Sequence, residues 1–473
     1  MVKSHIYISL LALLCYTHAT AQSLSLDACV ERALEHNRSL SSAKLKVDQA
    51  QFDMKSYKAN FYPKMNLMAL DFFSTAKGNF TIQGGHLPIY SYVPSSGQFV
   101  PNVTPNADGT YTLNQYADFP SQTMEWKLKN MFLGGVSITE PIYTGGKVTT
   151  AYNMSKIGVA MAQENIRLSE SEVIVKTHEA YHLTIKAKEL GDVARSYKSL
   201  LTELKKNVDG AFRHGMSTRN DMMKVQVKLN EAELSIQKAD NAYRLACMNL
   251  CHVIGMPLDS QIDFGDDQTA TSSLLGSSND STIILGRSSS IEERPEYALL
   301  EKKTELARQK IRLTKSDYLP TVAVGATYTY TNGGELAGKK LIDNGAASVG
   351  VAVKVPISIF GDAVNKTRSA KAAYQIAQLE QEDLNEQMRL ELSQCQNIYE
   401  ESLSELQLCQ LSLEQAAENM RLSKQQYEVG FETLSDYLET QAMWQKCYAN
   451  LVNARCQRQL AYVSLMKATG KLR

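Results

Sequence analysis

The longest regular series of apolar residues lies between positions 392 and 427. Its members recur at alternating steps of three and four residues, which is the spacing of a coiled-coil seam on one long α-helix. The seam is formed by Leu392, Cys395, Tyr399, Ser402, Leu406, Cys409, Leu413, Ala416, Met420, Ser423 and Tyr427. Leucines that fall off the seam, such as Leu408 and Leu411, predict that the helix contacts neighbours on more than one side.

A second pattern, with a period of two residues, predicts two pairs of β-strands. The first pair is expected near residues 64–74 and 125–142, and the second near 320–332 and 347–358. In the second pair, Asn332-Gly333-Gly334 has the composition of the connecting loop. Residues 78–120 are rich in Gly, Pro, Asn, Ser and Tyr, so we expect them to form an inserted extracellular loop.

The chain contains two copies of one plan: helix, strand pair, very long helix, turn and shorter helix. A shift of 257 residues places Pro63 on Pro320, and a shift of 215 places Gly146 on Gly361 and Gly215 on Gly430. Because missing a repeat misassigns the whole fold, these offsets set the expected domains. The first repeat covers residues 22–255, a linker or equatorial segment covers 256–290, and the second repeat covers 291–473.

Helix lengths add a constraint on how the copies are built. A helix from about Thr150 to Phe212 would span about 90 Å, whereas helices from about Leu26 to Asn60 and Thr218 to Ile254 would span about 50 and 55 Å. Ser25 or Asp27 is expected to cap the first of these helices. Two short helices stacked end to end match one long helix, which favours a tall helical cylinder.

The N-terminus has the features of a secretory signal peptide at residues 1–21. Lys3 precedes an apolar run and Ala19-Thr20-Ala21 matches a signal peptidase site. No later stretch approaches the roughly 20 apolar residues of a membrane-spanning helix. Any segment in contact with lipid must therefore belong to a closed β-barrel. With 50 basic and 50 acidic residues, the chain also lacks the charge of a nucleic-acid-binding protein.

Four strands per chain are too few for a membrane barrel, because closed outer-membrane barrels begin at eight strands. Three chains would supply twelve, an even number, with strand lengths suited to a thin outer membrane. We therefore expect a homotrimer in contact with outer-membrane lipid. The predicted fold class is mainly α with a small β part, in which twelve strands form a barrel that continues into an α-helical coiled-coil barrel.

Motifs that suggest an enzyme are weak in this sequence. His178-Glu179-Ala180-Tyr181-His182 matches the H-E-x-x-H pattern of zinc peptidases, but it lies within a very long helix and lacks an evident third ligand. Thr144-Gly145-Gly146-Lys147 lacks the leading glycine of a phosphate-binding loop. The cysteines are scattered, as expected for small core residues. We therefore expect no metal, no cofactor and no catalysis.

The chain resembles the TolC-like outer membrane efflux proteins over nearly its whole mature length. The resemblance rests on the signal peptide, the two-copy plan and the Pro141–Lys147 stretch that leads into the long helix. It also rests on two helix turns, Phe212-Arg213-His214-Gly215 followed by Asp221, and Tyr427-Glu428-Val429-Gly430 followed by Asp436. In that family the glycine turns lie at a periplasmic tip where an adaptor protein docks.

The resemblance implies roles for residues around both turns. Asp436, Glu439 and Asp221 would form acidic rings that constrict a closed periplasmic gate, since rings of carboxylates favour cations. Met216 and Phe431, beside Gly215 and Gly430, would contact the adaptor. Glu432 occupies a place where some relatives carry a basic residue bonded to a neighbour. The latch of the closed gate is therefore expected to differ in this chain.

The function implied is the outer-membrane exit duct of a tripartite efflux pump in a Gram-negative bacterium, passing drugs or other small toxic molecules. Its partners would be a periplasmic membrane-fusion adaptor and an inner-membrane pump of the resistance-nodulation-division or ABC type. The exit duct of a type I protein secretion system is the main alternative. A periplasmic adaptor is a weaker one, because adaptors carry a compact β-rich half rather than strand pairs inside helical repeats.

Overall fold

A computed structural model of the chain describes residues 24–260, 262, 291–357 and 360–472. The expected signal peptide and most of the expected linker lie outside these residues. The chain divides into two compact units. The helical unit comprises residues up to 55, 152–311 and 366–473, and the strand unit comprises residues 56–151 and 312–365. None of the described helices is both long and apolar enough to cross a membrane.

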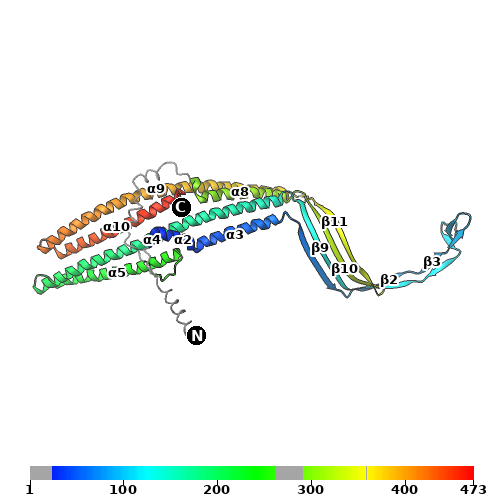
Figure 1. Cartoon of the computed structure of the whole chain (residues 1–473), viewed down its shortest axis with the longest axis horizontal. Coiled ribbons are helices and arrows are strands. Elements are labelled where there is room, and N and C mark those ends of the chain that lie inside the picture. Colours follow the sequence, from blue (N-terminus) through cyan, green and yellow to red (C-terminus); the bar gives the residue numbers. More distant parts are fainter. Residues whose placement is uncertain (1–23, 261, 263–290, 358–359, 473) are drawn as a thin grey trace, which may run out of the picture. The chain divides into compact units, whose positions relative to one another are not determined.

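The long helices and their shorter partners repeat with the predicted offset of 215 residues, and α3 and α8 repeat with the predicted offset of 257 (Figure 1). They are α2 (Leu26–His36), α3 (Arg38–Ala59), α4 (Lys147–Arg213), α5 (Arg219–Val253), α8 (Pro295–Ser316), α9 (Asp362–Glu428) and α10 (Leu434–Ala468), with a short 3₁₀ helix η1 (Ile291–Glu293) before α8. Both α4 and α9 have 67 residues, and both α5 and α10 have 35. The predicted pairing of a very long helix with a shorter one is confirmed.

The predicted seam of α9 is confirmed. All eleven of its side chains are buried or half-buried, and the serines at two positions are among the most buried. Ser402 satisfies its hydroxyl by donating to the carbonyl of Tyr399, at 2.7 Å. The off-seam leucines Leu408 and Leu411 remain 64% and 50% exposed in the single chain. Apolar side chains left exposed on a helix of this length are available for contacts with other chains.

The expected single helix over residues 26–60 is divided in two at Asn37. The side chain of Asn37 accepts a hydrogen bond from the backbone of Ser39 at 2.9 Å, and so caps α3. Its amide also donates to the carbonyl of Val253, at 3.0 Å, where α5 ends. At Gly255, which has φ +73°, a side chain would collide with His36. The break therefore lets α5 meet α2 and α3 closely. Ser25, one of the two expected caps, caps α2.

The second copy has the same kind of junction, where α10 meets η1 and α8. Gly470, the counterpart of Gly255, has φ +71° and lies so close to Glu293 and Arg294 that a Cβ would be only 3.1 to 3.2 Å from them. The Arg294 side chain is 3% exposed and forms ion pairs with Glu296 at 3.3 Å and Glu391 at 2.8 Å. A buried guanidinium requires such partners. The two junctions support the prediction of short helices stacked beside long ones.

Three of the described cysteines, Cys29, Cys251 and Cys456, are buried, and all seven described cysteines are free thiols. Burial, with a smaller contribution from the nearby Cys251, raises the pKa of Cys29 to about 12. A thiol that resists ionisation is a poor nucleophile and metal ligand. These residues therefore serve as small core side chains, as the sequence predicts.

The strand unit is built on an antiparallel sheet in the order β1-β9-β10-β11 (Figure 1). Its strands are β1 (Lys64–Phe73), β9 (Gln122–Tyr143), β10 (Thr321–Leu336) and β11 (Lys339–Lys354), and β2 (Lys77–Ile82) continues the edge of β1 along β9. Within the described residues, the outer edges of β1 and β11 pair with no further strand. This sheet thus has two open edges.

The Asn332–Gly334 loop is a wrong prediction, because these residues lie inside β10. The hairpin turns instead at Ala337 and Gly338, with φ values of 48° and 75°, and pairs Leu336 with Lys339. Gly333 is needed for close approach, since a side chain there would collide with the backbone of Asn130 and Met131 on β9. A glycine in a strand interior often has this role.

The expected loop over residues 78–120 is also wrong, because much of it is β-structure. A stem is formed by β3 (Gly85–Pro88) with β8 (Tyr116–Phe119), one arm by β4 (Tyr90–Val93) with β5 (Gln98–Pro101), and a second arm by β6 (Val103–Pro105) with β7 (Tyr111–Leu113). We call residues 83–121 the forked insertion. Its glycines, prolines and asparagines serve the turns and the junction between very short strands, which is why its composition resembles a loop.

The register of the sheet separates two chemically different faces, because side chains alternate between faces along each strand. The apolar face carries Met65, Leu67, Ala69, Phe73, Phe132, Val136, Ile138, Val322, Val324, Ala326, Tyr328, Tyr330, Ala347, Val349, Val351 and Val353. The opposite face is mostly polar or small: Asn66, Gly135, Ser137, Thr139, Ala323, Gly325, Thr327, Thr329, Thr331, Asn344, Ser348, Gly350 and Ala352. Each face has exceptions, most of them towards the ends of the strands. The polar face also carries Met68, Leu70, Phe72, Met131, Leu133 and Ile342, and the apolar face also carries Asp71, Asn130, Glu140, Asn332 and Asp343.

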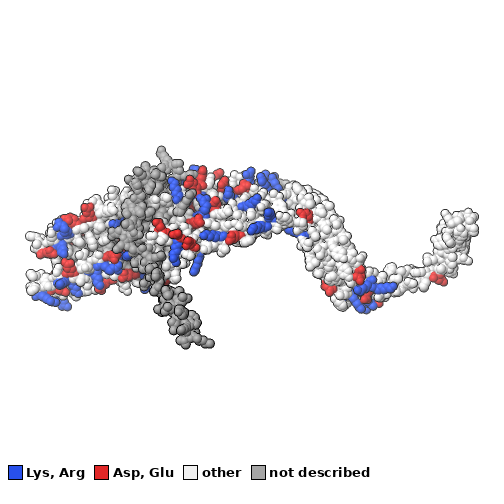
Figure 2. Space-filling model, viewed as in Figure 1, with Lys and Arg blue, Asp and Glu red and all other residues white. Residues whose placement is uncertain are grey.

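Charged side chains avoid the middle of the sheet and gather near the β10–β11 turn (Figure 2). Glu125 and Lys127 form an ion pair of 2.7 Å there, and Lys340 lies 4.0 Å from Asp343. A largely uncharged band that ends in charged residues is the pattern of a sheet that passes from hydrocarbon into a polar interface.

Candidate functional site

The two turns singled out in the sequence have the same backbone structure. Gly215 and Gly430 take φ values of +77° and +86°, which only glycine adopts without strain. In the first turn, Gly215 N–H donates to Phe212 and Met216 N–H donates to Ala211. The second turn repeats this pattern of bonds. This is a Schellman motif, so each glycine ends a long helix and reverses the chain into its shorter partner.

Each turn is followed by a matching helix cap that uses one of the predicted gate residues. Asp221 accepts hydrogen bonds from the backbone and the hydroxyl of Thr218, at 3.1 and 2.6 Å, and completes a capping box. Asp436 accepts from the hydroxyl of Thr433 at 2.6 Å. The hydrogen bond from Thr218 holds the pKa of Asp221 below its usual range. Both carboxylates are thus positioned by their own helix starts.

The other predicted site residues are exposed. Met216 is 78% and Phe431 is 87% exposed, directly after the glycine of each turn. Glu439 is exposed on α10 one turn beyond Asp436. The structure therefore presents one large apolar side chain per turn, with acidic side chains behind it on α5 and α10.

A compact apolar cluster joins all four helices near these turns. Its buried members are Tyr197, Leu201, Leu204, Val208, Val225, Ala232, Leu434, Tyr437 and Leu438. Tyr427 of α9 packs on the cluster and stacks on Tyr437, with ring centroids 5.3 Å apart and an angle of 14°. The cluster therefore holds the turns of the two repeats together.

Two polar contacts also link the repeats at this end, and sequence reasoning missed them. Lys424 of α9 donates to Glu203 of α4 at 3.2 Å, and Lys224 of α5 donates to Ser435 of α10 at 2.8 Å. The Glu203 carboxylate raises the pKa of Lys424, so this lysine stays charged. Both contacts are between residues more than 200 positions apart, which no local pattern could have indicated.

A groove of about 540 Å³ opens between the two turns. It is lined by Leu200, Glu203, Leu204, Asn207, Ala211, Met216, Lys424, Tyr427, Glu428, Val429, Gly430, Glu432 and Tyr437. Met216 and Gly430, both predicted docking residues, thus share one groove. One carboxylate oxygen of Glu432 is buried there without a hydrogen-bond partner among the described residues. A buried acceptor left in this state favours an incoming donor.

The H-E-x-x-H motif lies on α4, and only its two histidines come together there among the described residues. His178 and His182 lie on one face of α4 with ring centroids 6.0 Å apart, while Glu179 is exposed. No group of three or more metal-ligating side chains occurs among the described residues. The imidazoles are partly buried rather than solvated. Burial, together with nearby His178 and Arg458, lowers the pKa of His182 to about 4.

This burial predicts a loss of stability in acid. The unfolded chain binds a proton on His182 below about pH 6.5, whereas the folded protein keeps the ring neutral, so acid favours unfolding. The loss begins near pH 6.5 and levels off below about pH 4, at roughly 3 kcal/mol per chain. Thermal unfolding of His182→Gln should therefore depend less on pH than that of wild type, whereas His252→Gln, at an exposed site, should behave like wild type. Equal pH dependence in all three proteins would contradict this assignment.

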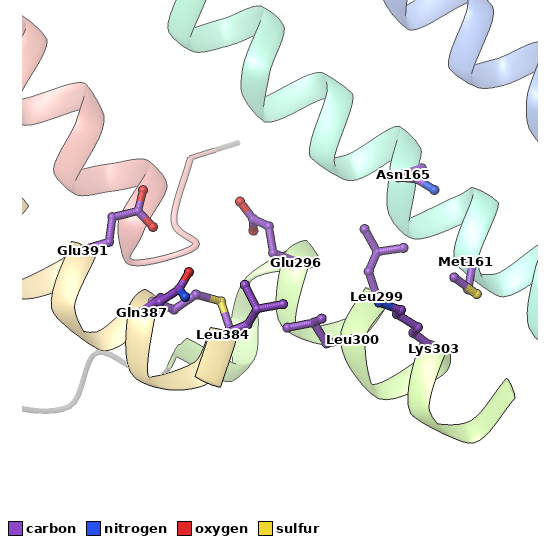
Figure 3. A pocket seen from close by; sticks show the side chains of 10 residues that line it. Met161, Asn165, Glu296, Leu299, Leu300, Lys303, Leu384, Gln387 and Glu391 are labelled. Carbon is purple, nitrogen blue, oxygen red and sulfur yellow. The ribbon is translucent and has the colours of Figure 1, made fainter. Parts of the chain in front are cut away.

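A second hollow of about 600 Å³ lies between α4, α8 and α9 (Figure 3). Its wall is mainly apolar, with Leu299, Leu300 and Leu384 facing the space and Met161 contributed by α4. Glu296 and Glu391 at one end are the partners of buried Arg294. Their charge is already engaged, so this hollow offers packing surface rather than a set of free catalytic groups.

The comparisons with known proteins decide which family this architecture represents. A family model described as outer membrane efflux protein matches residues 287–471, which is the second repeat. The crystal structure of the outer membrane protein VceC from Vibrio cholerae has the same fold, with a TM-score of 0.69. That likeness covers 94% of this chain and 96% of VceC, at 14% identity. Residues 287–471 thus match the outer membrane efflux protein family, and the whole chain has the fold of VceC. The predicted TolC-like fold and outer-membrane location are confirmed.

Two curated proteins are similar in sequence to this chain. TolC of Vibrio cholerae is 19% identical over 374 residues, which are 78% of this chain and 82% of TolC. The alkaline protease secretion protein AprF of Pseudomonas aeruginosa is 24% identical over 283 residues, 58% of this chain. The chain spans 55% of the length of AprF. The family consists of channels, which agrees with the expectation that this chain is not an enzyme.

Proposed function

We propose that this outer membrane efflux protein is, as a homotrimer, the exit duct of a tripartite pump that expels small toxic molecules. The observation that carries the proposal is the four-stranded sheet with two open edges and two unlike faces. Joining β11 of one chain to β1 of the next would close twelve strands, an even number within the range of outer-membrane barrels. Closure removes the open edges, which would otherwise pair indiscriminately.

The two faces suit such a barrel. Val349, Val351 and Val353 of the apolar face are 81%, 67% and 63% exposed in the single chain, as expected of side chains that meet lipid. The small and hydroxylated residues of the other face would line a water-filled interior. An outward apolar band and a polar lumen are the arrangement of channel-forming barrels.

The helix turns are proposed as the periplasmic gate. Three copies would place Asp436, Glu439 and Asp221 in rings around the closed end, and the capping bonds of Asp221 and Asp436 support fixed positions for these carboxylates. Such rings would favour cations and restrict passage. The contacts from Lys424 to Glu203 and from Lys224 to Ser435 are proposed as the latch. They would take over the role of the basic residue that some relatives carry at the position of Glu432.

The groove between the turns is proposed as the docking site of a periplasmic adaptor. Met216 and Phe431 would supply apolar contacts, and the unpaired Glu432 oxygen would accept a hydrogen bond from the partner. Gly215 and Gly430 would fix the turns at this site. An inner-membrane pump of the resistance-nodulation-division or ABC type would supply the energy, because no nucleotide motif is evident in this chain.

Neutralising the proposed gate tests its charge without removing hydrogen-bond acceptors. The double variant Asp436→Asn and Glu439→Gln is expected to lower the preference for K⁺ over Cl⁻ in planar bilayers and to raise conductance, because the carboxylate rings are lost. A matched control is Glu405→Gln with Glu414→Gln, on exposed positions of α9. Unchanged selectivity in the gate variant, or an equal change in the control, would refute the gate assignment.

A second candidate function is supported by the similarity to AprF, whose name describes alkaline protease secretion. The same duct could serve a type I secretion system, with a protein as its cargo. A strain that lacks this chain separates the two functions. Increased sensitivity to dyes and antibiotics with unchanged secreted protein supports efflux, whereas loss of one secreted protein with unchanged drug tolerance supports secretion.

A further inference from the structure

The forked insertion contains more organised structure than a surface loop needs. Its stem and two arms meet at a junction where Ile89 N–H donates to Gln115, Asn102 N–H donates to Ile89 and Asn114 N–H donates to Asn102, at 2.9 to 3.1 Å. Side-chain amides reinforce the junction, because Asn102 donates to Gln115 and Asn114 donates to Asn102. The sequence therefore specifies one geometry for the fork.

The first arm has one aromatic face and one mixed face, on which Val93 and Val100 lie beside Ser91 and Gln98. Tyr92 and Phe99 pair across β4 and β5 on one face, with ring centroids 5.3 Å apart, and are 56% and 70% exposed. Val100 lies on the opposite face and is 42% exposed. In the stem, Leu87 is 57% exposed on the face opposite His86 and Asp118. Two-stranded sheets are marginally stable without a hydrophobic face to cover them, so these faces require a partner.

The insertion is nearly free of charge. Residues 83–121 contain no Lys, Arg or Glu. Their Asp and His residues are Asp108, Asp118 and His86. His86 is hydrogen-bonded to Asp118 at 2.5 Å, and Asp108 accepts from Thr110 at 2.7 Å. Copies of this segment can therefore approach one another without strong repulsion between like charges.

The insertion begins at the edge proposed to join subunits. β2 continues the edge of β1 along β9, and the insertion connects the end of β2 to the start of β9. This is also the end of the sheet at which β10 and β11 turn, since Ala337 N–H donates to Glu125 at 2.8 Å. A ring of three sheets would present three insertions at one rim.

We propose that the three forked insertions pack against one another, aromatic face on aliphatic face, and cover the outer mouth of the channel. The inference rests on the trimer of the proposed function. Cyclic symmetry joins two different surfaces of each subunit, and each first arm offers two unlike faces, an aromatic one and one that carries Val93 and Val100. A partner that bound a single face would leave the second face exposed. The insertion thus becomes a second, outer constriction, separate from the helix turns.

Cross-linking between differently tagged chains tests this arrangement. Phe99→Cys and Val100→Cys chains are expressed together, and intact cells are treated with a short, membrane-impermeant bis-maleimide that spares thiols inside the envelope. Because the face with Tyr92 and Phe99 of one copy meets the face with Val100 of the next, we expect covalent dimers between the two tagged chains. Either variant expressed alone should give at least several-fold less dimer, and adding Tyr92→Asp to both chains should abolish the product.

Unheated gels of the same samples report whether the trimer is present. If the trimer is intact and no cross-link forms, the inference is overturned and the proposed function stands. Equal cross-linking by Phe99→Cys alone would have the same meaning. Absence of any trimer would overturn both. As a second measurement, replacing residues 83–121 by Asn-Gly joins Ile82 to Gln122 through a two-residue hairpin turn. The conductance of this trimer should exceed that of wild type, and an unchanged conductance would contradict a cover over the mouth.

Discussion

Replacing both Lys224 and Lys424 by alanine is expected to open the channel. These lysines bridge the two repeats through Ser435 and Glu203, which form the proposed latch of the gate. Exposed contacts of this kind contribute roughly 0.5 kcal/mol each. Two contacts in each of three subunits give on the order of 3 kcal/mol for the whole gate. The ratio of open to closed channels should therefore rise about 100-fold, since 1.4 kcal/mol corresponds to a factor of ten.

This gain is measured as the fraction of time that single channels spend at high conductance, and in cells as uptake of vancomycin, which intact outer membranes exclude. The control is the double variant Lys198→Ala and Lys228→Ala. Both lysines form ion pairs within the first repeat, Lys198 with Glu233 of the adjacent α5 and Lys228 with Glu231. Control channels should remain closed. Equal opening in both variants would mean that general loss of charge, rather than the link between repeats, controls the gate.

The second large effect concerns the faces of β11, where Ser348 and Val349 are adjacent. Val349 is 81% exposed on the apolar face, and Ser348 pairs with Thr327 on the polar face. Val349→Lys would place a charge against lipid, at a cost of about 2 to 4 kcal/mol per chain near the middle of the bilayer. We expect trimers of this variant to be strongly depleted from the outer membrane.

Ser348→Lys provides the matched comparison, because it changes the neighbouring residue in the same way on the opposite face. This variant should reach the membrane normally and shift the ion preference of the channel towards anions. Quantified trimer bands from outer-membrane fractions measure the first effect, and reversal potentials measure the second. Depletion of Ser348→Lys with normal levels of Val349→Lys would invert the assignment of lipid and lumen.

Periodicity predicted the long helices because the spacing of residues along them indicates which side chains are buried. Ser402 and Ser423 were placed on the seam of α9 by spacing alone, and both are buried. The repeat predicted α5 and α10 as equal partners, and each begins at the expected turn. Strong periods over tens of residues are insensitive to a single exception, which is why these predictions held.

Composition was less reliable where glycine had more than one possible use. Gly333 and Gly334 suggested a turn, but Gly333 allows β10 to lie close to β9, and the turn uses Ala337 and Gly338. The forked insertion was expected to be a loop because its strands have only three or four residues. Short strands separated by turns have the same composition as irregular loops.

The candidate site was predictable only in its local part. Gly215, Gly430, Asp221 and Asp436 belong to turn and cap motifs that a few neighbouring residues specify. The links from Lys424 to Glu203 and from Lys224 to Ser435 depend on how the two repeats pack. The roles of Glu439, Met216 and Phe431 stay predictions, because they require the partner chains.

The central claim is that three copies of this outer membrane efflux protein enclose a water-filled duct. Its most direct test is single-channel recording, in planar bilayers, of the Lys224→Ala and Lys424→Ala protein purified as an unheated trimer from outer membranes. We predict discrete conductance steps that are larger and longer than those of wild type. A purified trimer that inserts into the bilayer and gives no steps, or protein recovered only as a soluble periplasmic monomer, would contradict the account.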